Sequence, residues 1–283
     1  MHNNEVSSLI SLLDDDDSEV VSAVMDRLCA KGEEAMPLLE SAWHNAFEEL
    51  QLTRLEHIIT QIHDNATLAK LKEWVQEGAP DMLSGAYYIS KLFRPNIEFN
   101  HIKQQVEALS REIWLELHAH LTALEQVYII NYVIRKHRFL GLRLVNSDRL
   151  LLLSDLLQSK EGCQISFGLL YCCIAEVLRL PIAGVNFSQS AMLGYIDANG
   201  EDMLFFIDPC SGEFYGKMQM LQAIARFVSP QKSTEYQLMP CSRKTYLLRY
   251  ARLLSELYRL TDKPQQHAKA SRAVEILSAK KAS

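Results

Sequence analysis

Residues 160–181 read KEGCQISFGLLYCCIAEVLRLP, and this stretch is the most strongly patterned part of the chain. Apolar residues fill most positions after Gln164, without the alternation that a strand would show. The pattern predicts one long apolar helix from about Gln164 to Arg179. Cys172 and Cys173 fall in its middle, where free cysteines usually act as apolar packing residues.

Downstream of this helix the hydrophobic period changes from that of a helix to that of a strand. Three short runs are rich in β-branched and aromatic residues, and Asn199-Gly200 between the last two is a hairpin signal. They predict an antiparallel meander, followed by a helix from about Lys217 to Val228. Because period-two patterning appears nowhere else, we expect a single small sheet confined to about 183–215. The runs are Ala183–Phe187, Ala191–Asp197 and Met203–Asp208.

Residues 5–75 have apolar positions at helical spacing and predict two or three amphipathic helices. Ser18 can cap one helix, Gly32 can end it, and Pro37 suits the first turn of the next. This arrangement resembles one HEAT-type repeat. The acidic run from Asp14 to Asp17 is interpreted as a solvated turn, since it lacks the spacing of a calcium loop.

More helices are predicted at about 67–78, 81–93 and 98–120. Thr122 and Glu125 form a capping-box pattern that opens a helix ending near His137. Residues 243–279 are again predicted to be helical, with a break at Pro264 that makes a helical hairpin. Such a hairpin resembles a tetratricopeptide-like unit or a plain pair of docking helices, and the plain pair is favoured. Its predicted apolar face consists of Leu247, Leu248, Ala251, Leu254, Leu257 and Leu260.

Composition narrows the class of protein. The 283 residues include 35 acidic and 29 basic side chains, a formal charge of -6 that suggests neither a nucleic-acid nor a membrane-surface partner. No apolar stretch approaches the ~20 residues of a membrane span, and the N-terminus lacks the basic region of a signal peptide. Six scattered cysteines favour reduced thiols. The expected location is therefore cytoplasmic.

No cofactor or metal is expected. The chain has no Cys-x-x-Cys, no His-Glu-x-x-His and no glycine-rich phosphate loop. His118 and His120 lie two residues apart in a predicted helix, which places them on different faces and disfavours a shared metal ion.

Four blocks together resemble bacterial transglutaminase-like proteins of the SirB type: Lys160–Tyr171, Ala175–Pro181, Gly184–Phe187 and Phe206–Pro209 with Gly212. The resemblance implies an α+β fold, mostly helical, in which a small papain-like α/β core with an antiparallel sheet lies between helical segments. The expected domains are a HEAT-like segment at 1–118, the transglutaminase-like core at 119–240 and a helical hairpin at 241–283.

In active members of this superfamily, the resemblance implies a cysteine at the start of the central helix, a histidine on the next strand and an aspartate on the one after. The helix N-terminus stabilises a thiolate, the imidazole takes its proton, and the carboxylate fixes the imidazole tautomer. By the family spacing, the cysteine position falls on Gln164 and not on Cys163, and the histidine position falls on Ser190. The aspartate position is retained as Asp208.

No histidine occurs between His137 and His267, so the core cannot supply a Cys–His pair by itself. Cys163 is favoured as a small, semi-buried packing residue without an activating base, and Asp208 as a turn or capping carboxylate. Gln164 and Ser190 are expected to line a remnant cleft. The residues predicted to contribute to binding are Gln189 and Tyr171.

Three functions are compatible with these residues. The favoured one is a non-catalytic binding or scaffolding module that recognises a peptide or protein partner. The alternative is a cysteine hydrolase or acyltransferase that uses Cys163 with a histidine from outside the core, His137 being nearest in sequence. The third is a purely structural subunit. An imidazole within hydrogen-bonding reach of the Cys163 sulfur would distinguish the first two.

Overall fold

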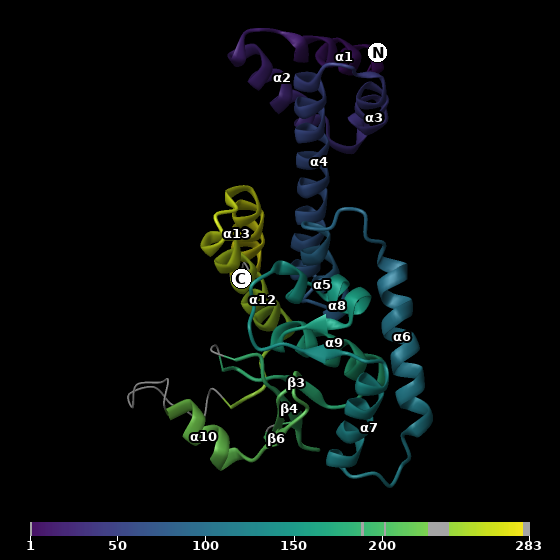
Figure 1. Ribbon diagram of the computed structural model, residues 1–283, viewed down its shortest axis with the longest axis vertical. Helices are drawn as coiled ribbons and strands as arrows, with labels where there is room; N and C mark the ends of the chain where they lie inside the picture. Colours follow the sequence, from purple (N-terminus) through teal and green to yellow (C-terminus); the bar gives the residue numbers. More distant parts are fainter. Residues whose placement is uncertain (1, 188–189, 201, 226–237, 280–283) are drawn as a thin grey trace. The chain divides into compact units, whose positions relative to one another are not determined.

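The computed structural model describes residues 2–187, 190–200, 202–225 and 238–279 (Figure 1). The chain divides into two compact units, Met1–Lys70 and Leu71–Ser283. Helix α4 (Glu49–Gln76) contributes residues to both units. No helix in the described part of the chain is long and apolar enough to cross a membrane.

The first unit is helical throughout, as predicted, but has four α-helices where two or three were expected. Val24, Leu39 and Ile58 belong to one buried cluster that joins these helices. The cap of α2 is Asp17, whose side chain accepts from the Glu19 amide, and the prediction that Ser18 caps it is wrong. The helices are α1 (His2–Ser11), α2 (Ser18–Lys31), which ends at Gly32, α3 (Met36–Asn45), with Pro37 in its first turn, and α4.

The predicted separate helix at 67–78 is wrong, because this stretch forms the C-terminal part of α4. The helices that follow agree with their predicted positions to within a few residues. The Thr122–Glu125 capping box is present. These helices are α5 (Met82–Lys91), α6 (Phe99–Glu116) and α7 (Ala123–Lys136).

The centre of the second unit is α9 (Gln164–Leu178), which is buried continuously from Ile165 to Ala175. Such an apolar helix is stable only when other elements cover every face. It packs against α5, α6, α8 (Leu153–Ser159) and β3 (Ile182–Gly184). The helix ends at Arg179, which adopts a left-handed conformation with φ 56°.

The predicted antiparallel meander is confirmed as a four-stranded sheet in the order β3-β4-β5-β6. The pairing register of β4 and β5 shifts between Tyr195 and Ile196. This antiparallel sheet lies within residues 182–215, as expected, but the expectation of a single sheet is wrong, because β1 and β2 form a separate parallel pair. The strands are β1 (Leu140–Gly141), β2 (Glu161–Gly162), β3, β4 (Leu193–Ile196), β5 (Met203–Ile207) and β6 (Phe214–Tyr215).

After the sheet come α10 (Lys217–Ala225) and the predicted helical hairpin, α12 (Arg243–Leu260) and α13 (Pro264–Ser278). The end of the predicted helix at 217–228 lies outside the described residues. Tyr246, Tyr250 and Leu254 of α12 are fully buried, whereas Leu260, predicted on the apolar face, is 68% exposed. Thus α12 completes the core and leaves part of its surface open.

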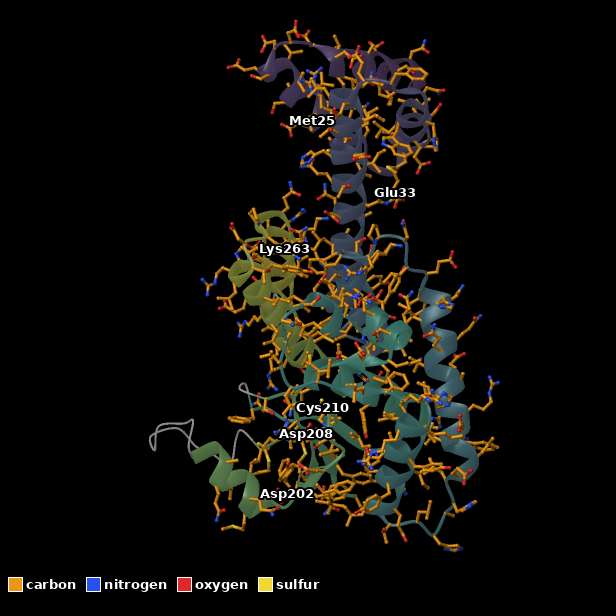
Figure 2. All side chains as sticks on the ribbon, in the orientation of Figure 1. Met25, Glu33, Asp202, Asp208, Cys210 and Lys263 are labelled. Carbon is orange, nitrogen blue, oxygen red and sulfur yellow. The ribbon has the colours of Figure 1, made fainter. Side chains whose placement is uncertain are left out.

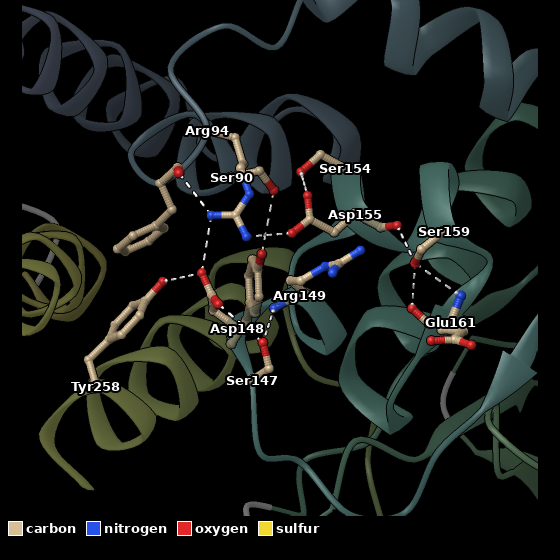
Figure 3. A network of polar contacts seen from close by, with 12 residues as sticks. Ser90, Arg94, Ser147, Asp148, Arg149, Ser154, Asp155, Ser159, Glu161 and Tyr258 are labelled. Carbon is tan, nitrogen blue, oxygen red and sulfur yellow. Dashed lines mark hydrogen bonds and ion pairs between the residues drawn. The ribbon is translucent and has the colours of Figure 1, made fainter. Parts of the chain in front are cut away.

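A polar network fixes α12 to the rest of the unit (Figure 3). Arg94 donates to Asp148 at 3.1 Å and to Asp155 at 2.7 Å, and the Tyr258 hydroxyl of α12 donates to Asp148 at 3.0 Å. Burial raises the pKa of Asp148, but Arg94 and Tyr258 outweigh it and leave the pKa below its ordinary value. For Asp155 burial prevails over Arg94, and the pKa is raised.

Candidate functional site

A cavity of about 830 Å³ opens in the second unit, beside the N-terminus of α9. Segments that are distant in sequence form its sides: the stretch after β1, the start of α9, the turn after β5, and one face of α12. The four residues of the predicted remnant site all line it. These are Cys163, Gln164, Ser190 and Asp208.

Cys163 precedes α9 and is held by a compact set of backbone contacts. The Leu142 amide, just after β1, donates to the Gly162 carbonyl at 2.7 Å. The Cys163 amide donates to the Ser166 hydroxyl at 3.0 Å, and Ser166 donates to the Leu150 carbonyl at 2.7 Å. A Cβ on Gly162 would lie 2.6 Å from Ser166 Oγ, so the position requires glycine. The fold thus fixes Cys163 at the helix N-terminus, with its side chain only 4% exposed.

Gln164 and Ser190, which the resemblance places at the nucleophile and base positions, contact each other. Ser190 Oγ donates to Gln164 Oε1 at 2.9 Å, and the Ala191 amide donates to the same oxygen at 3.0 Å. A carboxamide and an unactivated hydroxyl supply neither a thiolate nor a proton acceptor of imidazole strength. Gln164 and Ser190 therefore line the cavity with polar groups that are already hydrogen-bonded to each other.

Asp208 follows β5 and holds the turn toward β6, close to Cys210 (Figure 2). Its Oδ1 accepts from the Cys210 amide at 2.9 Å, and its carbonyl accepts from the Gly212 amide at 2.7 Å. This is the turn role favoured from the sequence. Burial, with a smaller contribution from the Asp208 carboxylate, raises the pKa of the Cys210 thiol to about 11. Cys210 is therefore a protonated thiol near neutral pH.

The histidines that flank the core in sequence are engaged elsewhere. His137 Nε2 lies 2.7 Å from Glu112 Oε2, and His267 Nδ1 donates to the Ser255 carbonyl at 2.9 Å. Within the described residues, no imidazole lines the cavity or lies within hydrogen-bonding distance of the Cys163 sulfur.

Tyr171 and Gln189 were predicted to contribute to binding. Tyr171 is buried in the core, where its hydroxyl donates to Asn131 Oδ1, and Asn131 donates to the Gly212 carbonyl at 3.1 Å. Burial raises the pKa of Tyr171. These hydrogen bonds hold Gly212, at the end of the Asp208 turn, and neither Tyr171 nor Asn131 lines the cavity. Gln189 lies outside the described residues.

One wall of the cavity comes from α12, which the sequence did not connect with a site. Arg249 donates to the Val185 carbonyl and, at 3.2 Å, to Asn186 Oδ1. Arg252 and Leu253 follow one turn later and are exposed. The α12 residues that line the cavity recur at helical spacing and share Leu257 and Leu260 with the predicted apolar face, so spacing alone did not single out this wall. They are Arg249, Arg252, Leu253, Glu256, Leu257 and Leu260.

The described residues contain no group of three or more histidine, cysteine, aspartate or glutamate side chains arranged to hold a metal ion. No curated protein and no solved structure matches this chain significantly. The family model described as "Transglutaminase-like superfamily" matches residues 100–252, more than half of the sequence. This range contains α9, the sheet and the turn at Asp208. The chain therefore belongs to the transglutaminase-like superfamily.

Proposed function

We propose that this protein is a non-catalytic member of its superfamily that binds a peptide segment of a partner in the cavity beside α9. One observation carries the proposal: the cavity is lined by all four positions of the remnant site, yet by no imidazole among the described residues. Thiol catalysis requires a base that converts the thiol into a thiolate.

The remaining geometry fits binding better than chemistry. The side-chain oxygen Oε1 of Gln164 accepts from both the Ser190 hydroxyl and the Ala191 amide, so these groups are committed to each other. Asp208 is used by its own turn. The volume of about 830 Å³ falls within the ~300–1,000 Å³ typical of ligand sites. A fold that retains its cleft after losing the base can still present that cleft to a partner.

The alternative, a cysteine hydrolase or acyltransferase, is favoured by one feature. Cys163 lines the cavity at the N-terminus of α9, where the helix dipole favours a thiolate. The same experiment can examine both functions, because they differ in what they require of this sulfur.

Peptides would be selected from a random display library on the full-length protein, and their affinities measured for two variants. Leu253→Asp places a charge in the cavity wall and should weaken binding about tenfold or more. Cys163→Ala should leave binding unchanged. The matched control is Leu204→Asp, since Leu204 is 56% exposed and Leu253 46% exposed, but Leu204 lies on β5 outside the cavity lining.

A panel of activated esters and thioester peptides, followed by intact mass and product release, completes the experiment. We expect neither turnover nor an adduct that depends on Cys163. Turnover that disappears in Cys163→Ala would establish the enzyme instead. Selected peptides that bind Leu253→Asp as well as the wild type would place binding outside the cavity.

A further inference from the structure

The α12 wall of the cavity carries uncompensated positive charge, which bears on the chemistry of its ligand. Within the described residues, Arg249 donates to neutral acceptors: the Val185 carbonyl, the Asn186 side chain and the Cys241 side chain. Arg252 and Arg143 also line the cavity, and neither forms an ion pair with a described residue. Guanidinium groups present up to five donors each, so donors are in surplus on this surface.

The described lining of the cavity also contains three carboxylates, of which Asp208 and Glu213 belong to the turn after β5 and Glu256 to α12. Asp208 accepts from the Cys210 amide, and Glu213 accepts from the Tyr215 hydroxyl at 2.7 Å. Glu256 is paired with Arg259, at 2.6 and 2.9 Å. On α12, therefore, the one carboxylate of the lining is already paired with Arg259, and Arg249 and Arg252 have no carboxylate acceptor on this wall.

Apolar side chains continue from the arginines along the same face of α12. Leu253 and Leu260 are 46% and 68% exposed, and Leu257 lies between them. Leu142 and Val145 also line the cavity. Exposed leucines at helical spacing beside a polar rim are typical of peptide-binding grooves.

Building on the proposed function, we infer that the peptide is acidic and aliphatic: one or more carboxylates bind Arg252 and Arg249, and large aliphatic side chains lie along Leu253, Leu257 and Leu260. A carboxylate on a guanidinium forms a charge-assisted, bidentate contact, which gives the site its selectivity. Burial of aliphatic side chains against Leu253, Leu257 and Leu260 adds affinity that depends little on the peptide sequence.

The test uses three fluorescein-labelled, end-blocked hexapeptides that alternate leucine with aspartate, asparagine or lysine. Fluorescence anisotropy with the full chain should show the aspartate peptide binding at least about tenfold more tightly than the asparagine peptide. Its affinity should fall as NaCl is raised. Arg252→Glu should weaken the aspartate peptide and strengthen the lysine peptide.

Arg252 suits this test because it is exposed and forms with the described residues no ion pair that the fold needs. The matched control is Arg111→Glu, which makes the same change of charge at an exposed position of α6 outside the cavity. It should leave all three affinities unchanged. Decanoate, an aliphatic acid without a peptide backbone, should compete poorly.

Equal binding of the three peptides would overturn the inference, and so would an aspartate peptide whose affinity is unchanged by Arg252→Glu. The proposed function would still be supported in either case if the library peptides lose affinity for Leu253→Asp. Decanoate that competes as well as the aspartate peptide would also overturn it, in favour of a small aliphatic acid. If neither the hexapeptides nor any library peptide binds, both proposals fail.

Discussion

Gln164 and Ser190 both line the cavity and are joined by a hydrogen bond, and this has a consequence for the ancestry of the site. Side chains 2.9 Å apart can be replaced by a thiol and an imidazole that also meet, provided the backbone stays in place. Asp208 lines the same cavity and offers a carboxylate nearby.

Gln164→Cys combined with Ser190→His should therefore form a coupled ion pair. Such a pair lowers the pKa of a thiol, so the new cysteine should alkylate with iodoacetamide at pH 6 faster than either single variant predicts. Mass spectrometry would map the label. If the folded double variant reacts no faster than Gln164→Cys alone, these positions are not those of a former Cys–His pair.

Gly168 on α9 permits the close approach of a buried tyrosine. A Cβ at this position would lie 1.9 Å from Tyr246 Oη, and this hydroxyl donates to the Ala191 carbonyl at 3.1 Å. Gly168→Ala should consequently lower the free energy of unfolding by about 1–3 kcal/mol, despite the better helix propensity of alanine.

Tyr246→Phe removes the clashing oxygen and leaves the Ala191 carbonyl without this donor, at a cost of about 1 kcal/mol. Gly168→Ala should therefore cost about 1 kcal/mol less in the phenylalanine background than in the wild type. Urea denaturation of the four proteins measures the coupling. Strict additivity would show that the ring moves aside freely.

The residues after Gly162 were identifiable from the sequence because family spacing places them together, and Cys163, Gln164, Ser190 and Asp208 do line one cavity. Arg249 and Arg252 were not identifiable in this way. Which face of an amphipathic helix borders a cavity depends on the elements packed against it, and helical spacing alone does not contain that information.

At the scale of elements, Arg94, in the turn after α5, donates to Asp155 of α8 and to Asp148, which also accepts from Tyr258 of α12 (Figure 3). Because the pKa of Asp148 is lowered in the folded protein, its ionised form contributes stability above the unfolded-state pKa of about 4. That contribution is lost as the pH falls through the lower, folded-state pKa.

Asp148→Asn should thus lower the free energy of unfolding by about 2 kcal/mol at pH 7, and by progressively less below pH ~4. Urea denaturation at several pH values measures the difference from the wild type. The control Asp202→Asn, at a residue whose side chain is 75% exposed, should change stability little at any pH. A difference for Asp148→Asn that is constant with pH would contradict the assignment.

Elements long enough to show a hydrophobic period were predictable from the sequence, and two-residue strands were not. A capping box predicted α7, a long apolar run predicted α9, and an apolar face at helical spacing predicted α12. Short runs of β-branched and aromatic residues predicted the meander. The two-residue strands β1 and β2 are too short to show a period, although their pairing holds the chain just before Cys163. Tertiary packing, not local pattern, determines such strands.

For the whole molecule, each compact unit has apolar clusters of its own. The buried apolar cluster of the unit Met1–Lys70 consists of residues between Val6 and Ile62. Every residue that lines the cavity lies between Gly141 and Leu260, in the other unit. The predicted domain boundaries at 118 and 240 stay predictions. The physical division at residue 70 falls inside α4, where the sequence has no glycine or proline to mark it.

A fragment of residues 71–283 should therefore fold and bind the selected peptides with affinity within about threefold of the full chain. Circular dichroism during heating and fluorescence anisotropy measure both properties. The full chain serves as the control. Loss of cooperative unfolding, or an affinity more than tenfold weaker, would show that the cavity needs residues of the first unit.

The position of α12 after α9 and the sheet affects how the protein folds during synthesis. Its side chains Tyr246, Tyr250 and Leu254 are buried, Tyr246 lies against Gly168 of α9, and α12 packs against α5, so a nascent chain that has reached residue 225 still exposes the apolar surface they will cover. Transiently exposed apolar surface of this kind is prone to aggregation, which is one reason why chaperones exist. Because the same helix forms the arginine and leucine wall, the protein should acquire its stability and its capacity to bind a ligand together, once α12 has been made.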